Sequence, residues 1–180
     1  MATSILRCLT LASALGLAGC ASPGPRSQPP VVESSPDEPA EDTEALVDAH
    51  NQVRARFRRP PLTVDPRLEA AAQMHADDMA QRNRLRHRGG DGSSPFERMQ
   101  TQGYPFERAA ENIACGQTMI AEVMRGWMTS PGHRRNILGK YSQIGTACAI
   151  AKDGTRYWCV TFGQPTGADH PSRPSIVGYP

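Results

Sequence analysis

The chain has 180 residues, of which 38% are hydrophobic and 21% charged, and it contains 16 glycines and 16 prolines. This length suits one globular domain with additional non-globular segments, and a second full domain does not fit. Because 20 Lys and Arg residues are balanced by 18 Asp and Glu residues, the charge disfavours general binding of nucleic acid, and no such partner is expected.

The amino-terminal segment has the pattern of a bacterial lipoprotein signal peptide. Arg7 precedes an apolar run over residues 8–20, which is shorter than the roughly 20 residues that a membrane-spanning helix needs. The run ends in Leu-Ala-Gly-Cys, which resembles the lipobox whose cysteine receives a lipid and becomes the mature amino terminus. We therefore predict a signal peptide over residues 1–19 and lipidation of Cys20, with a plain signal cleavage nearby as the alternative.

Residues 20–40 are predicted to be the lipidated cysteine and a tether. Residues 21–40 contain six prolines among serines and acids, and they have almost nothing to bury. Fully extended as polyproline II, such a segment reaches on the order of 60 Å. Ala21 follows the cysteine where Asp is the usual inner-membrane retention signal, so we expect an outer-membrane anchor facing the periplasm if the host is Gram-negative. Residues 166–180 are predicted to be a flexible tail.

The segment after the tether begins with predicted helices. The first starts at Asp42 or Thr43 and ends before a Pro-Pro pair, because its apolar residues recur at helical spacing. After an extended stretch at residues 62–64, Asp65 caps a second helix, which has proline at its first position and His75 on its buried stripe.

Three shorter helices are predicted to follow. Ser94 and Glu97 form a capping box at the start of the third helix. The fourth places apolar residues, including Trp127, on one face, and Ser130 caps a fifth that ends near Gly139. The expected order is therefore a run of helices before any long strand.

The pattern then changes to strands. Residues 144–151 alternate with period two, Asp153-Gly154 predicts a two-residue hairpin turn, and residues 155–162 form a strand rich in Tyr, Trp and Val. Early helices and a late hairpin, without β-α-β alternation, predict an α+β domain over residues 41–165 with helices packed on an antiparallel sheet.

Several motifs occur in order along this domain. They are His50-Asn51-Gln52-Val53-Arg54, residues 68–79, Glu111-Asn112-Ile113-Ala114, residues 127–138, and Ile144-Gly145 followed by Tyr157-Trp158 and Phe162-Gly163. Together they resemble the CAP superfamily of cysteine-rich secretory proteins, antigen 5 and pathogenesis-related proteins, also called SCP-like, in its bacterial branch. The resemblance implies a three-layer α-β-α sandwich and a secreted protein, which agrees with the export signal.

The resemblance also implies a cleft that is formed by two histidines and two acids. His87 matches the first histidine, Glu111 matches the acid that opens Glu-Asn-Ile-Ala, and His133 matches the second histidine. The second acid has no counterpart, because Trp127 is followed by Met, Thr and Ser. The implied ligand-binding cleft therefore contains His87, Glu111, Ser130 and His133, and a mechanism with two carboxylates is in doubt.

The chemistry of this cleft has open alternatives. His87 and His133 are candidate ligands of a divalent metal such as zinc, with Glu111 as third ligand or as the group that orients one imidazole. The same three residues are the candidates for proton transfer. The alternative for each histidine is a hydrogen-bonded structural role, since the sequence contains no His-Glu-x-x-His. Ser130 is interpreted as a helix cap rather than a nucleophile, because Ser before Pro at a helix start satisfies the capping pattern. No cofactor is firmly predicted.

Arginines gather around both histidines. Positions 82, 84, 86 and 88 alternate around His87, and positions 134 and 135 follow His133. They predict a positive potential that favours anionic ligands such as phospholipid head groups or wall-peptide carboxylates. A solvated loop is the alternative.

Three cysteines remain after the predicted processing. If Asp153-Gly154 is a two-residue turn, Cys148 lies directly opposite Cys159 with Cα atoms about 5.5 Å apart, which is within the disulfide range. We therefore predict a Cys148–Cys159 disulfide with Cys115 free, since export permits oxidation. A bridge from Cys115 to either partner is the alternative.

Two classes of function follow from these features. The first is a membrane-anchored lipoprotein that binds a lipid or another envelope ligand in the cleft. The second is a hydrolase of the peptidoglycan glycan that uses Glu111 with His87 and His133. A glycosidase of the usual kind needs two carboxylates, so the binding function is favoured. The oligomeric state stays open.

Overall fold

The structure is a computed structural model that describes residues 39–167. Within them five helices and four strands follow one another: α1 Pro39–Arg56, β1 Thr63–Val64, α2 Pro66–Arg82, α3 Pro95–Thr101, β2 Phe106–Cys115, α4 Ile120–Thr129, α5 Pro131–Ile137, β3 Gln143–Ile150 and β4 Arg156–Pro165. None of the described helices has the length and apolar character needed to cross a membrane. The predicted signal peptide, Cys20, most of the tether and the tail after residue 167 lie outside the described residues.

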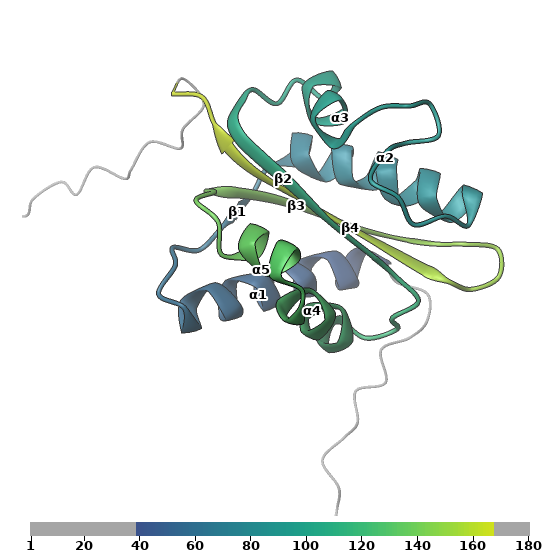
Figure 1. Cartoon of the computed structure of the whole chain (residues 1–180), viewed down its shortest axis with the longest axis horizontal. Helices are drawn as coiled ribbons and strands as arrows, with labels where there is room; N and C mark the ends of the chain where they lie inside the picture. Colours follow the sequence, from purple (N-terminus) through teal and green to yellow (C-terminus); the bar gives the residue numbers. More distant parts are fainter. Residues whose placement is uncertain (1–38, 168–180) are drawn as a thin grey trace, which may run out of the picture. The chain divides into compact units, whose positions relative to one another are not determined.

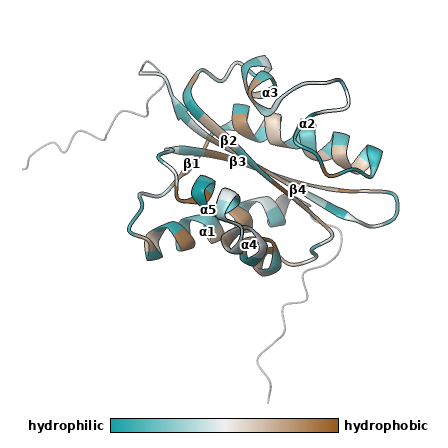
Figure 2. Ribbon diagram, in the orientation of Figure 1, coloured by the Kyte–Doolittle hydropathy of each residue, from teal (hydrophilic) through white to brown (hydrophobic). Residues whose placement is uncertain are grey.

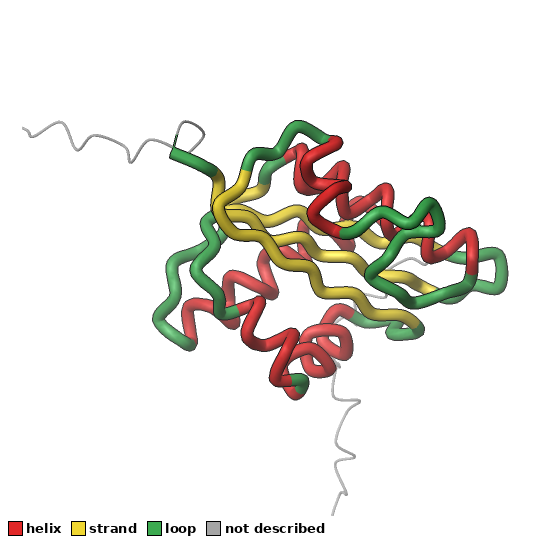
Figure 3. The backbone as a smooth tube through the Cα atoms, turned by 45° about the horizontal axis from the view of Figure 1, so that its top comes forward, coloured by secondary structure: helices red, strands yellow, loops and turns green. Residues whose placement is uncertain are grey.

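The four strands form one sheet that lies between two layers of helices. The strand order is β1-β3-β4-β2, so β2 is an edge strand, and α2 and α3 cover one face while α1, α4 and α5 cover the other (Figures 1 and 3). This arrangement confirms the α+β class and the three layers. The sheet was expected to be antiparallel, but it is mixed, because the two-residue β1 pairs in parallel with β3. The long strands β2, β3 and β4 pair antiparallel.

Each face of the sheet carries its own hydrophobic core. On the side of α1, α4 and α5 the core is built from large side chains, among them Trp127 and Trp158. On the side of α2 it consists largely of alanines, such as Ala72 and Ala76 against Ala147. Figure 2 shows the apolar colouring concentrated along the central strands. The small side chains let α2 approach the sheet closely.

The helix starts confirm part of the predicted capping chemistry. Asp65 accepts a hydrogen bond from the backbone N–H of Arg67 at 2.9 Å, and Ser94 forms the complete capping box with Glu97. Ser130 is the N-cap residue of α5, as predicted, but its side chain makes no capping hydrogen bond. Helix α1 begins at Pro39, upstream of the predicted start, and the carboxylate of Asp42 instead pairs with Arg156 of β4.

Strand β2 is the element that the sequence pattern did not predict. Its core-facing residues are interrupted by charged and polar ones, and its amino-terminal half is largely exposed. An edge strand with polar side chains lacks the clean apolar alternation on which strand prediction depends. The acid of the Glu-Asn-Ile-Ala motif therefore lies on a strand rather than in a loop.

The β3–β4 hairpin has a different register from the predicted one, and the predicted disulfide is wrong. Strand β3 ends at Ile150 and β4 starts at Arg156, so the connection is longer than a two-residue turn. Cys148 therefore pairs with Trp158, and its side chain enters the core on the opposite face from Cys159. Cys148, Cys159 and Cys115 are all free thiols, which also excludes the alternative bridge from Cys115 in this structure.

The close approach of α2 to the sheet yields a stability prediction at Gly145. A Cβ atom added there would lie 2.2 Å from backbone atoms of Leu68 and Glu69, which cannot move without displacing the helix. We expect Gly145→Ala to lower the free energy of unfolding by about 1–3 kcal/mol or more, measured by chemical denaturation. Gly126→Ala is the matched control, because nothing lies within 4 Å of its added Cβ in α4. It should raise stability by up to about 1 kcal/mol, and an equal loss in both variants would contradict the prediction.

Candidate functional site

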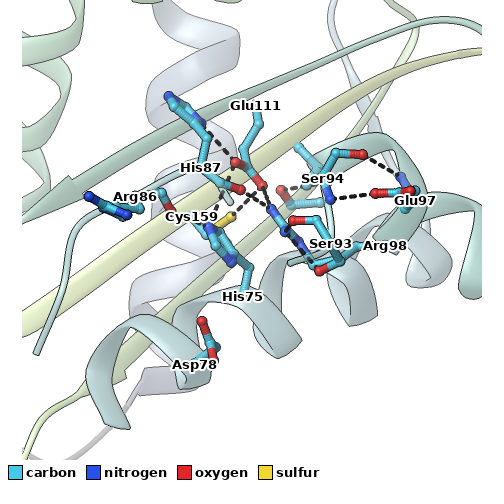
Figure 4. Close-up of polar contacts among 12 residues, drawn as sticks. His75, Asp78, Arg86, His87, Ser93, Ser94, Glu97, Arg98, Glu111 and Cys159 are labelled. Atoms are coloured by element: carbon cyan, nitrogen blue, oxygen red, sulfur yellow. Dashed lines mark hydrogen bonds and ion pairs between the residues drawn. The ribbon is translucent and has the colours of Figure 1, made fainter. Parts of the chain in front are cut away.

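The candidate site is centred on the buried carboxylate of Glu111 in β2. Its side chain is 2% exposed and points toward the layer formed by α2 and α3. Nδ1 of His87 donates to Oε1 at 2.8 Å, and Nη2 of Arg98 donates to Oε2 at 2.8 Å (Figure 4). Both carboxylate oxygens are therefore occupied by protein donors.

Arg98 provides the charge that compensates this carboxylate. It lies on α3, and its side chain is 3% exposed. Besides Glu111, it donates to the backbone carbonyl of His87 at 3.0 Å and to that of Ser93 at 3.0 Å. Because α3 starts with the capping box of Ser94, the helix places Arg98 at a fixed position behind the loop that carries His87.

His75 and Cys159 complete the surroundings of Glu111. Nε2 of His75 lies 2.7 Å from the carbonyl of Arg86, to which it donates, and 3.8 Å from Oε1 of Glu111. Burial lowers the pKa of His75, so the ring is neutral at neutral pH. The thiol of Cys159 lies 3.6 Å from Oε2 of Glu111, and burial raises its pKa well above the usual range, so it is not a reactive thiolate.

His133 approaches the same strand from the other layer. Its backbone carbonyl accepts from Nδ2 of Asn112 at 3.2 Å, and Nδ2 of Asn136 donates to the Asn112 side chain at 2.9 Å and to the Glu111 carbonyl at 3.3 Å. Its ring packs edge-on against Trp127. Burial lowers the pKa of His133, and electrostatic repulsion by His87 lowers it further.

The structure thus brings some of the predicted site residues together and adds others. His87 and Glu111 are in direct contact, and His133 is tied to the same strand through its backbone. Ser130 begins α5, but its hydroxyl makes no capping bond. Sequence reasoning missed Arg98 and treated His75 only as a core residue. Since a buried carboxylate needs a cation, a partner for Glu111 was to be expected, but the sequence spacing could not select it among the chain's many arginines.

The arrangement does not fit a metal centre. Among the described residues, no group of three or more His, Cys, Asp or Glu side chains has the geometry to hold a metal ion. Glu111 is already neutralised by Arg98, whose guanidinium would repel a cation beside it. The zinc site predicted at His87 and His133 therefore lacks a third ligand from this network.

Comparison with known proteins identifies the family to which this fold belongs. Residues 47–162 match the cysteine-rich secretory protein family, CAP, and the chain belongs to that family. Among curated proteins, YkwD of Bacillus subtilis (strain 168) is 37% identical over 101 residues, which are 56% of this chain and 39% of YkwD. The membrane protein YlbC of the same strain is 28% identical over 101 residues, which are 56% of this chain and 29% of YlbC. The chain thus spans less than half of either relative.

Solved structures show the same fold. An outer surface protein from Borrelia burgdorferi superposes with a TM-score of 0.66 at 23% identity, covering 70% of this chain and 94% of that one. An extracellular protein with an SCP domain from Bacillus anthracis gives a TM-score of 0.65 at 24% identity, covering 77% of this chain and 45% of that one. At this level of identity the likeness extends to the fold alone.

The Glu111–Arg98 pair yields a stability prediction. Arg98→Met should lower the free energy of unfolding by about 3–5 kcal/mol, because it leaves a buried carboxylate without its cation. Chemical denaturation measures the change. Arg82→Met is the matched control, since Arg82 forms an exposed ion pair with Asp78 and should lose less than about 1 kcal/mol.

A second variant separates loss of the ion pair from loss of packing. Replacing both partners, in Arg98→Met with Glu111→Met, removes the uncompensated charge and should restore part of the lost stability. A double variant that is less stable than Arg98→Met alone would contradict an electrostatic role for the pair.

Proposed function

We propose that the protein is an exported, lipid-anchored CAP domain that binds an envelope ligand at His87 and His133 without catalysing a reaction. The observation that carries this proposal is the contrast between Glu111 and His87. The carboxylate is buried with both oxygens bonded, whereas the His87 side chain is 52% exposed. A buried and fully bonded carboxylate orients the imidazole and does not itself face a ligand.

The hydrogen bond to Glu111 fixes how His87 meets a ligand. An ionised carboxylate only accepts, so Nδ1 of His87 carries the proton in this bond. In the neutral ring, Nε2 is then an acceptor for a ligand hydroxyl or amide, and in the protonated ring it donates to an anionic group. His133 supplies a second imidazole, which burial keeps neutral over a wider pH range.

The alternative function is hydrolysis of peptidoglycan with Glu111 as general acid or base. Glycosidases of the usual kind place two carboxylates on either side of the bond that is cleaved. Here the segment after Trp127 offers Met128, Thr129 and Ser130 in place of an acid. Proton exchange by Glu111 would also require it to release Arg98 or His87. These features favour binding over turnover.

Export and anchoring rest on the sequence pattern at Cys20 and agree with the family. The names of the structural neighbours describe an outer surface protein and an extracellular protein. A lipid on Cys20, followed by the proline-rich residues 21–40, would hold the domain near a membrane while letting it reach other parts of the envelope. The ligand is therefore expected to be a lipid or another envelope component.

The first prediction from this proposal concerns Cys20. Mass spectrometry of the mature amino terminus should find acylated Cys20 as its first residue. Cys20→Ser should abolish the modification and leave the protein unprocessed or soluble. An unmodified mature chain that begins at another residue would contradict the anchor.

The second prediction separates binding from hydrolysis. Purified peptidoglycan incubated with wild-type protein should release no muropeptides, and a lipid extract of protein purified from its native envelope should contain a retained ligand detectable by mass spectrometry. The combination of His87→Ala with His133→Ala should lose that ligand, because both proposed contacts are removed.

His170→Ala is the matched control, since it removes an imidazole from the predicted tail rather than from the domain. Ligand retention that is the same in wild type and in the double histidine variant would contradict the binding site. Reproducible muropeptide release that disappears in Glu111→Gln and in His133→Ala would establish the hydrolase instead.

A further inference from the structure

A cavity lined by arginines lies between the end of α2 and the segment that follows it. Its volume is about 210 Å³, and its lining residues are Asp78, Arg82, Arg84, Arg86, Arg88, Gly89 and Gly90. A cavity of this size has room for a small polar group. Four of its seven lining residues are arginines.

The buried network described above fixes the backbone of this segment. His75 donates to the carbonyl of Arg86, Arg98 donates to the carbonyl of His87, and the His87 side chain bonds to Glu111. The His87 side chain thus points inward to Glu111, whereas Arg86 and Arg88 line the cavity. Figure 4 shows Arg86 on the side away from Glu111. Arg86 is therefore positioned through its backbone, because its guanidinium has no partner among the described residues.

The charge inside the cavity is only partly compensated. Asp78 is the one acid among the lining residues, and its two oxygens already accept from Nε of Arg82 at 2.7 Å and from the backbone N–H of Gly90 at 2.9 Å. Nη1 of Arg88 donates to a neutral carbonyl, that of Gly92. Among the described residues, the guanidinium groups of Arg84 and Arg86 have no hydrogen-bond or ion-pair partner.

The Asp78 contacts also shape one wall of the cavity. A Cβ atom added at Gly90 would lie 1.9 Å from Cζ of Arg82, so the guanidinium rests directly against the Gly90 backbone. Asp78 binds both the Arg82 guanidinium and the Gly90 backbone, so Arg82 forms one wall of the cavity, and the unpartnered Arg84 and Arg86 are available to an occupant. Arg84 and Arg86 thus line the cavity without a protein anion of their own.

We propose that this arginine cavity binds a phosphate group. Several guanidinium forks around one small space match the many oxygens and the double charge of a phosphate monoester better than a single carboxylate. Leu85, in the same segment, is 43% exposed, which suits a phosphate carried on a lipid surface as well as a free one. Neither His87 nor His133 is among its lining residues, so the proposal assigns a ligand chemistry to residues that the proposed histidine contacts do not use.

The test uses the full-length chain with Cys20→Ser, so that no lipid anchor contributes to binding. Calorimetric titration with sn-glycerol 3-phosphate and with inorganic phosphate should detect saturable binding that weakens as salt rises. Arg84→Gln combined with Arg86→Gln should weaken binding at least tenfold, because these two side chains have no other partner among the described residues.

A matched pair of substitutions controls for net charge. Arg56→Gln with Arg125→Gln removes the same charge from exposed positions on α1 and α4 and should change the affinity by less than twofold. No saturable binding of either phosphate, or an equal loss in both pairs of variants, would overturn the proposal. His133→Ala should leave phosphate binding unchanged, so failure of the proposed histidine site and failure of this cavity are distinguishable.

Vesicles identify the source of the phosphate. Co-sedimentation with equimolar phosphatidylcholine and phosphatidylglycerol, competed by glycerol 3-phosphate and reduced at least tenfold in Arg84→Gln with Arg86→Gln, would assign a lipid head group. Binding of the soluble phosphates without vesicle binding would assign a free phosphate and equally supports the cavity. Vesicle binding that neither the competitor nor the arginine variant reduces would overturn its role at membranes.

Discussion

The ion pair between Glu111 and Arg98 is the interaction on which the functional face of this domain depends. A carboxylate with 2% of its side chain exposed is costly to bury unless it is paired and hydrogen-bonded, and both conditions are met by Arg98 and His87. The pair joins β2 to α3 across a segment that has no regular secondary structure of its own. The ion pair therefore stabilises the position of that segment more than it stabilises the hydrophobic core.

The buried Glu111–Arg98 pair determines where the exposed groups of the site lie. The segment between α2 and α3 has no regular secondary structure, and the carbonyls of Arg86 and His87 are held by the buried side chains of His75 and Arg98. A loop holds its binding residues in one geometry only where other side chains fix its backbone. Here the support is polar and buried, so a change at Glu111 would disturb both the imidazole and the arginine cavity.

The sequence predicted the features that depend on local chemistry and missed those that depend on distant partners. The caps at Asp65 and Ser94 and the α2 stripe were predictable, because their signals lie within a few residues. The hairpin register was not, since the length of the β3–β4 connection decides which residues face each other, and one position of error reverses the face of Cys148. Arg98 was missed for the same reason, because nothing near it in the sequence reveals that Glu111 is its partner.

Strand β2 connects the site to both helical layers. Glu111 and Asn112 are consecutive, so their side chains point to opposite faces: Glu111 meets His87, and Asn112 holds the backbone of His133. As β2 is an edge strand, its outward groups would otherwise be open to pairing with another chain. Asn136 of α5 covers the Glu111 carbonyl and bonds to Asn112 as well. Asn136 thus covers one carbonyl of the edge strand and fixes α5 beside it, and Asn112 in turn holds the His133 backbone, so the two amides together link the edge strand to the placement of His133.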